Sequence, residues 1–141
     1  MSREIKFRFW DIKCEIMIKS GSSEIYISDT GETWDYVYDS YEEFLTRNKT
    51  VAIMQYTGVK DKNDVEIYEG DIIQGDIMHD NRFLGTMGVV VYDKNQGSFA
   101  NKNCSGLGLM HKLYHIKVIG NVFDNPEIFI DDPELLNINP E

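Results

Sequence analysis

The residues best suited to metal chemistry lie in the second half of the chain. His111 and His115 are four positions apart, the spacing that places two imidazoles on one face of a helix in zinc sites. No glutamate accompanies His111, and in a neighbouring strand this spacing would separate the two by about 13 Å. Asp76, His79 and Asp80 offer oxygen and nitrogen donors for a divalent cation, but in a polar loop where such residues are usually solvated. We therefore predict no metal site and no cofactor, and leave cation binding by the second cluster as an open alternative.

Cysteine chemistry is the next candidate. Cys104 precedes Ser105 and Gly106, and either His111 or His115 could serve it as a base. The apolar residues that follow indicate packing, and no third member of a triad can be identified. With only one other cysteine, Cys14, the sequence predicts two free thiols in a reducing cytosol.

Carboxylates and glycines of the middle region could support acid–base or phosphate chemistry. Glu66, Glu69 and Asp71 surround Gly70, and paired carboxylates can exchange protons. A tight turn needs the same residue types for its geometry, so we expect Asp71 to accept backbone N–H groups there. The glycine pair at 106–108 lacks the third glycine of a phosphate-binding loop. No catalytic residue is predicted, and we expect a protein that is not an enzyme.

Short strands with specified turns must position these residues. Ile5, Phe7 and Phe9 alternate with Lys6 and Arg8, the pattern of a half-buried strand. The same reading predicts a polar loop over 76–84, a buried strand over 88–92 and a second loop over 101–108. Further strands are expected at 15–19, 24–28, 51–56, 65–68, 71–74, 98–100 and 116–119, and the structural turn residues are Gly58, Gly70, Asp71, Gly120, Asn121 and Pro126.

One helix is predicted, over residues 41–47. Asp39 or Ser40 could cap it, each with a glutamate three residues later, Glu42 or Glu43. Such a helix has only about two turns and depends on packing for its stability. The expected fold class is therefore mainly β (α+β): a small β-barrel with a smaller N-terminal α+β subregion.

Charge limits the function classes. The 141 residues include 14 basic and 24 acidic ones, a net charge of −10. Nucleic-acid binding requires basic residues to neutralise phosphates, so nucleic acid is an unlikely partner here. The one basic–aromatic cluster, Arg3, Lys6 and Arg8 with Phe7 or Trp10, keeps a barrel that binds single-stranded nucleic acid as the alternative. With no apolar run long enough for a bilayer, we expect no membrane contact and a cytoplasmic location in a bacterial host.

The strongest local asymmetry of charge is the stretch from residue 24 to residue 43. It holds seven acids, five aromatic residues and no base. Aromatic rings supply contact area and carboxylates steer a basic partner, although the same residues could simply form a soluble mini-core. The predicted protein-interaction residues are Glu24, Asp29, Glu32, Trp34, Asp35, Tyr36, Tyr38, Asp39, Glu42 and Glu43.

Five segments, in order along the chain, resemble the YopX family of bacteriophage and prophage proteins. They read REIKFRFWD (3–11), IMQYTGVKDKND (53–64), EIYEGDII (66–73), GVVVYD (88–93) and VIGNVFDNPE (118–127). Asp64 stands where the family usually has glycine, which places a non-glycine residue in a left-handed turn position. Residues 14–50 match poorly and could carry the specificity of this member.

The resemblance implies a phage-encoded protein with a variable N-terminal α+β part, a C-terminal SH3-like barrel and no assigned enzymatic activity. We expect a single domain with subregions 1–50 (α+β), 51–130 (β-barrel) and 131–141 (acidic tail). The predicted function is a non-enzymatic module that binds a host or phage protein. It could mimic DNA with its acidic face, and it could form homo-oligomers through edge strands. An enzyme of unknown type is the third hypothesis.

Overall fold

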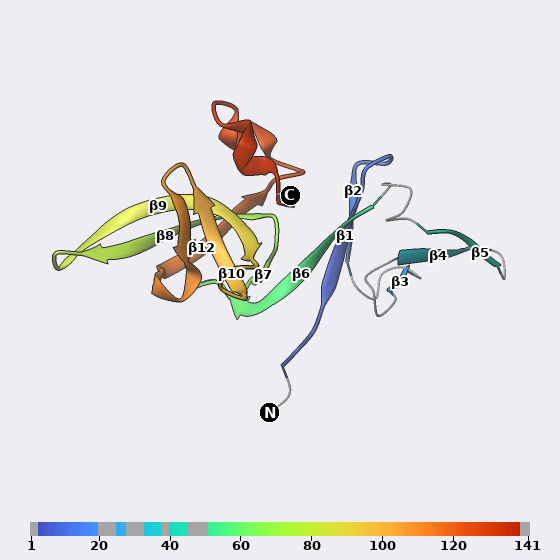
Figure 1. Ribbon diagram of the computed structural model, residues 1–141, viewed down its shortest axis with the longest axis horizontal. Coiled ribbons are helices and arrows are strands. Elements are labelled where there is room, and N and C mark those ends of the chain that lie inside the picture. Colours follow the sequence, from blue (N-terminus) through green and yellow to red (C-terminus); the bar gives the residue numbers. More distant parts are fainter. Residues whose placement is uncertain (1–2, 20–24, 28–32, 38–39, 45–50, 139–141) are drawn as a thin grey trace. The chain divides into compact units, whose positions relative to one another are not determined.

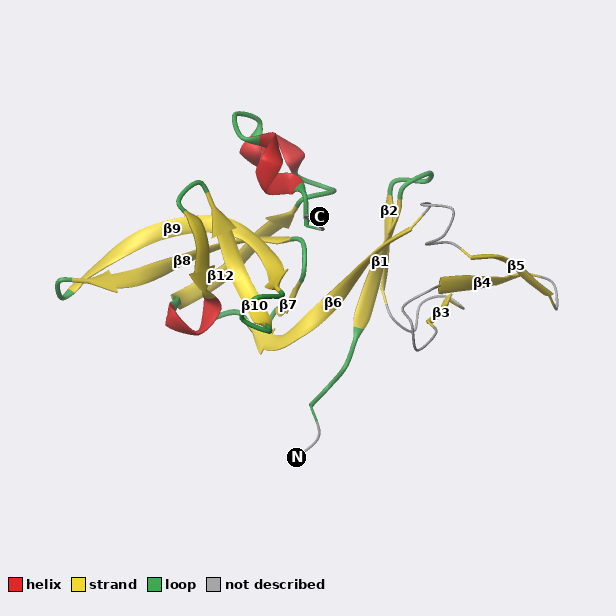
Figure 2. Cartoon of the chain, in the orientation of Figure 1, coloured by secondary structure: helices red, strands yellow, loops and turns green. Residues whose placement is uncertain are grey.

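The structure is a computed structural model, which describes residues 3–19, 25–27, 33–37, 40–44 and 51–138 (Figure 1). The chain is mainly β, and all its strand pairs are antiparallel. In the described residues, helix is limited to three short 3₁₀ turns, η1 (Met110–Lys112), η2 (Pro126–Phe129) and η3 (Pro133–Leu136), seen in red in Figure 2. No helix of the described residues is long and apolar enough to cross a bilayer.

The chain divides into two compact units. One is Glu4–Gln55, and the other is Tyr56–Glu141 together with Met1–Arg3. The division falls within strand β6 (Val51–Lys60), so this ten-residue strand contributes its two halves to different units.

The unit of residues 4–55 contains two groups of strands. β1 (Phe7–Asp11) pairs with β2 (Ile16–Lys19) on one side and with the first half of β6 on the other. The strand predicted over residues 5–9 begins only at Phe7: Phe9 is buried as expected, but Ile5 precedes the strand and is 60% exposed. A separate three-stranded sheet has the order β3 (Ile25–Ile27), β4 (Thr33–Val37), β5 (Ser40–Phe44).

The helix predicted over residues 41–47 is wrong for residues 41–44. These residues belong to β5, which pairs with β4 in the register Trp34↔Phe44 and Val37↔Ser40. A two-turn helix is marginal by itself, whereas β4 offers backbone hydrogen-bond partners for this segment. Residues 45–47 lie outside the described part of the chain, and no α-helix occurs in the described residues of the N-terminal subregion.

The unit that starts at Tyr56 is built on a curved five-stranded sheet, which forms a half-barrel. Its order is β11 (Gly106–Leu109), β10 (Ser98–Asn103), β9 (Arg82–Asp93), β8 (Asp71–His79), β12 (Tyr114–Asn121). β7 (Glu66–Tyr68) pairs with the second half of β6.

Two segments predicted as loops are in fact strands of this sheet. Residues 76–84 close the β8–β9 hairpin through Asp80 and Asn81, whose φ values of 48° and 60° suit a two-residue hairpin turn. Residues 101–108 supply the β10–β11 hairpin. Their polar composition led to the loop prediction, yet polar residues are common in strands that are exposed to solvent.

The core explains the run of three valines in β9. Val89, Val90 and Val91 are all buried, as the sequence predicted. Val90 packs in a cluster with Ile67, Ile73 and Met110 on one face of the sheet. On the other face η3 contacts β9, and the Nζ of Lys102 on β10 donates a hydrogen bond of 2.9 Å to the carbonyl of Glu134. The C-terminal segment therefore covers the second face of β9, which is why alternation is absent there.

Candidate functional site

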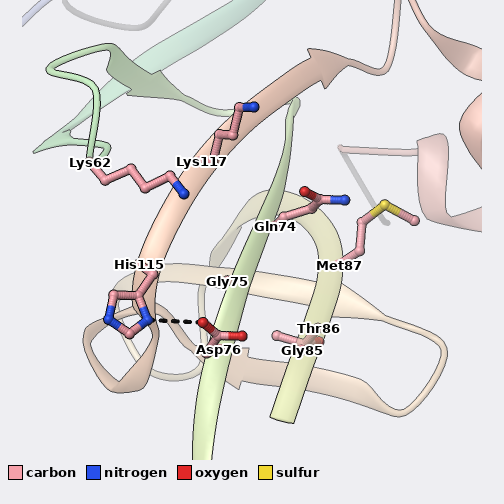
Figure 3. Close-up of a pocket in the computed structure, with 9 residues that line it drawn as sticks. All are labelled: Lys62, Gln74, Gly75, Asp76, Gly85, Thr86, Met87, His115 and Lys117. Atoms are coloured by element: carbon pink, nitrogen blue, oxygen red, sulfur yellow. Dashed lines mark hydrogen bonds and ion pairs between the residues drawn. The ribbon is translucent and has the colours of Figure 1, made fainter. Parts of the chain in front are cut away.

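An open pocket of about 420 Å³ lies within the unit that starts at Tyr56. Its size is in the range of small-ligand sites. Strands β8, β9 and β12 and the turn after β6 supply its walls (Figure 3). It is lined by Lys62, Gln74, Gly75, Asp76, Gly85, Thr86, Met87, His115 and Lys117.

The position of Lys62 is fixed by its neighbour Asp61. The Oδ1 of Asp61 accepts the N–H groups of Asn63 and Val65 at 2.8 and 3.0 Å, and its Oδ2 accepts the N–H of Val118 at 2.9 Å. The N–H of Lys62 itself donates to the carbonyl of Ile116 at 2.9 Å. One buried carboxylate thus holds the turn against β12, and Lys62 extends from that turn toward the strand that carries Lys117 and His115 (Figure 3).

The electrostatics of Asp61 follow from this arrangement. Burial raises the pKa of its carboxyl group, but the three backbone N–H donors and the positive charge of Lys62 outweigh burial and lower the pKa below its ordinary value of 3.8. Asp61 therefore stays ionised, with its lone pairs committed to the turn. Its role is structural.

On the opposite side of the pocket, Asp76 meets His115. The Nδ1 of His115 lies 2.9 Å from the Oδ2 of Asp76, so Nδ1 donates and Nε2 is left for other partners. The register between β12 and β8 shifts by one residue between Tyr114 and Lys117, and His115 has a φ of 55°. This bulge turns His115 onto the face of Asp76. A non-glycine residue in this conformation costs about 1–3 kcal/mol, and such strain is concentrated at functional sites.

The pairing of β8 with β9 keeps the pocket open. Two residues directly opposite in this strand pair point to the same face of the sheet, and every second pair shares that face. Three such pairs follow one another along one side: Ile72–Val89, Gln74–Met87 and Asp76–Gly85. The first of these pairs is buried, and the later ones reach the pocket. Gly85 has no positive φ, and a Cβ there would meet only the Oδ1 of Asp76, at 3.9 Å. Neither space nor backbone conformation therefore requires glycine there, and the absent side chain leaves this part of the pocket unfilled.

Charge distinguishes this pocket from the rest of an acidic chain. Lys62 and Lys117 are both exposed, and neither forms an ion pair with any residue in the described ranges. Asp76 is the one carboxylate in the lining, and it is already paired with His115. Two ammonium groups and the amide of Gln74 are donors suited to an anion, and the imidazolium form of His115 would add a donor at Nε2.

The chemical candidates of the sequence are placed elsewhere or separately. Asp76 pairs with His115 rather than with His79, whose Nδ1 lies 3.3 Å from the Oδ2 of Asp80. Within the described ranges no group of three metal-ligating side chains comes together. Cys14 and Cys104 are exposed free thiols.

The predicted turn residues do not all lie in turns: Gly58 lies inside β6, where its register with β7 shifts, whereas Gly70 lies in the turn between β7 and β8. Gly58 and Gly70 have φ values of 86° and 82°, and the Oδ2 of Asp71 accepts the N–H of Tyr68 at 2.8 Å. Asp64 has the left-handed φ of 65° expected where the family has glycine. At Gly120 a side chain would collide with Asn125. Asn121 accepts the N–H groups of Phe123 and Asp124, and Pro126 opens η2.

Most of the acidic stretch lies beyond what the structure describes. Glu24, Asp29, Glu32, Tyr38 and Asp39 are outside the described residues. Trp34, Asp35 and Tyr36 lie in β4, and Glu42 and Glu43 lie in β5, where only the course of the backbone is described.

The basic–aromatic cluster at the N-terminus has limited capacity to stack on bases. Trp10 is buried, and the Nζ of Lys6 pairs with Glu4 at 2.8 Å. A buried ring offers no stacking platform to a nucleobase. Of the two rings considered for stacking, Trp10 is thus unavailable, whereas Phe7 is only partly buried, and nucleic-acid binding stays an alternative.

A patch of exposed apolar side chains was missed by the sequence analysis because its segment was predicted as a loop. Ile77, Met78, Phe83 and Leu84 at the free end of the β8–β9 hairpin, and Tyr114 at the start of β12, are each 40–50% exposed. The ring of Phe83 lies 5.4 Å from that of Tyr114 and 5.0 Å from that of His115. We call these five residues the hairpin patch. The apolar pairs Ile77–Met78 and Phe83–Leu84, one on each side of the turn, could have revealed it, had a hairpin been expected.

Comparisons with known proteins agree on one family. A family model described as YopX protein matches residues 6–129. A solved structure of protein EF1440 from Enterococcus faecalis is 25% identical, with a TM-score of 0.60, over 90% of this chain and 99% of that one. That of protein yopX from Bacillus subtilis is 21% identical, with a TM-score of 0.52, over 86% and 95%. No curated protein matches the chain. As the resemblance of its five segments predicted, the chain belongs to the YopX family.

Proposed function

We propose that this protein is a phage- or prophage-encoded accessory protein that acts without catalysis by binding another protein. The observation that carries the proposal is the hairpin patch, where four large apolar side chains of one hairpin and Tyr114 of β12 remain half exposed. Large apolar side chains left exposed on both faces of one hairpin can mark an interaction site, because their burial against a partner is favourable. Aromatic residues such as Phe83 and Tyr114 are typical anchors of such interfaces.

The fold proposed for residues 51–130 is an SH3-like barrel. The half-barrel sheet and the backbone hydrogen bond from Lys62 to Ile116, which brings the β6–β7 turn beside β12, support it. Such a barrel would give the hairpin patch a rigid base.

The chemistry of the partner follows from charge. The net charge of −10 and the seven acids between residues 24 and 43 favour a partner with a basic surface. A sharper version is that the acidic face mimics DNA and occupies the nucleic-acid groove of a host protein. Neutralising these seven acids to Asn or Gln would then abolish capture of that partner, and binding that survives the change would contradict the mimic.

The main test is capture from a nuclease-treated bacterial lysate, with Phe83→Ser and Ile130→Ser compared with the unmodified chain. Ile130 is 75% exposed and lies outside the patch, so its substitution removes a similar exposed apolar group. We expect Phe83→Ser to lose a specific partner that Ile130→Ser retains. Equal capture by both variants would overturn the role of the patch.

The same variants distinguish a second copy of this chain from a different protein. If the partner is another copy, light scattering of the purified protein shows an oligomer that Phe83→Ser dissociates. A gel shift at low salt tests the alternative of single-stranded nucleic acid, and turnover abolished by one polar substitution would show an enzyme.

A further inference from the structure

The pocket between β8, β9, β12 and the Asp61 turn has a composition that the protein-binding proposal does not explain. It brings Lys62 and Lys117 together although they are 55 positions apart in an acidic chain. Two lysines that line one pocket give it a positive potential, which favours an anionic ligand. Neither ammonium group forms an ion pair with a carboxylate in the described ranges, although the charge of Lys62 acts on the neighbouring Asp61.

The remaining lining groups fit the same ligand. Asp76 holds the Nδ1 of His115 at 2.9 Å, which orients the ring and leaves Nε2 available to a ligand. Gln74 adds an amide, and Gly85 leaves the floor of the pocket open beside Asp76. Lysine and imidazole donors around a hollow of about 420 Å³ match a phosphoryl group together with a small attached body.

We propose that this pocket binds a small phosphate-bearing ligand, with Lys62 and Lys117 neutralising the phosphoryl oxygens and His115 donating to them from Nε2 as an imidazolium, with a proton on both ring nitrogens. Two sources share this chemistry, inorganic phosphate and a mononucleotide. The aromatic side chains of Phe83 and Tyr114, which adjoin His115, offer a surface to a base in the second case.

The experiment is calorimetric titration of the full chain, in a phosphate-free buffer at constant ionic strength, with inorganic phosphate, with AMP and with uncharged adenosine. We expect saturable binding of at least one phosphorylated probe with a Kd below about 1 mM, and none of adenosine. Tighter binding of AMP than of phosphate identifies a mononucleotide, and equal binding identifies the phosphoryl group alone. Amide shifts of Gly75, Gly85 and His115 in nitrogen-15 NMR would locate the site.

Three variants and one control sharpen the test. Lys62→Ala and Lys117→Ala should each weaken binding roughly tenfold or more, because a charge-assisted hydrogen bond contributes about that factor. Gly85→Val fills the pocket without changing charge and should also weaken binding. Lys94→Ala, at an exposed lysine of the β9–β10 turn, removes the same charge elsewhere and should change the Kd less than about twofold.

Several results would overturn the proposal. These are no saturable binding of either phosphorylated probe, equal binding of adenosine and AMP, or equal weakening by Lys94→Ala and Lys62→Ala. Tighter binding of a single-stranded 12-mer than of AMP, with Lys94→Ala also weakened, would instead assign the surface to nucleic acid. Both lysine side chains are exposed, so their variants should fold, and thermal unfolding checks this.

Discussion

Asp61 and Asp76 both accept hydrogen bonds of about 2.9 Å from groups on β12, yet the turn that contains Asp61 and the pocket that contains Asp76 have different roles. Asp61 is 8% exposed and accepts three backbone N–H groups, so most of its acceptor capacity is used within the fold. The side chain of Asp76 is 32% exposed and holds one imidazole, itself 56% exposed. The two residues have the same type and the same bond length, so these do not tell their roles apart. Burial and the number of backbone partners do: they distinguish an aspartate that stabilises the fold from one that orients a site.

The largest effect is expected at Asp61. Asp61→Ala removes the acceptor of three N–H groups and should lower the free energy of unfolding by roughly 2–4 kcal/mol. Urea unfolding at pH 7 measures it. Asp80→Ala, at an aspartate whose side chain is 88% exposed, is the control and should leave stability unchanged. Equal midpoints for all three proteins would show that the Asp61 turn does not hold the fold.

The stabilising effect of Asp61 should also depend on pH. Its pKa is lower in the folded chain than the ordinary 3.8, so its ionised form contributes stability above about pH 3.8 and loses it as the pH falls through the folded value. Asn cannot titrate. The stability difference between the unmodified chain and Asp61→Asn should therefore be constant between about pH 5 and 7 and shrink below pH 3.8. A difference that grows on acidification would reverse the assigned direction of the shift.

A smaller effect of opposite sign is expected at His115. His115→Gly relieves a left-handed residue at φ 55° and should be neutral or stabilising by up to about 1 kcal/mol, despite loss of the imidazole. His79→Gly makes the same substitution in β8 without a left-handed φ and should destabilise by about 0.5–1 kcal/mol. Thermal unfolding compares the two. Equal destabilisation would mean that no strain is held at the bulge.

The smallest effect on stability is expected at Asp76. Its partner is an exposed histidine, and exposed pairs contribute little, so Asp76→Asn should change the free energy of unfolding by less than about 0.5 kcal/mol. The side-chain NMR signals of His115 should change clearly, because the ring loses its orienting acceptor. A large loss of stability would place Asp76 with Asp61 among the residues that hold the fold.

Short-range patterns in the sequence were sufficient to predict part of the fold. The buried strand around Val90 follows from an unbroken apolar run, and the left-handed turn at Asp64 follows from its KDKND context. The helix predicted over residues 41–47 and the loop over 76–84 failed because helix caps and polar composition are weak signals, which pairing with a neighbouring strand overrides.

The sequence by itself determined the β-rich class, the family and the residues that must turn, because these depend on short-range alternation and on a few backbone conformations. The pocket depended on tertiary structure. Lys62 meets Lys117 only because Asp61 fastens a turn to β12, and His115 meets Asp76, 39 residues away, only because of a one-residue bulge. At a bulge one strand has an extra residue, so its side chains change from one face of the sheet to the other. The local alternation of residue types in the sequence does not encode that shift of register.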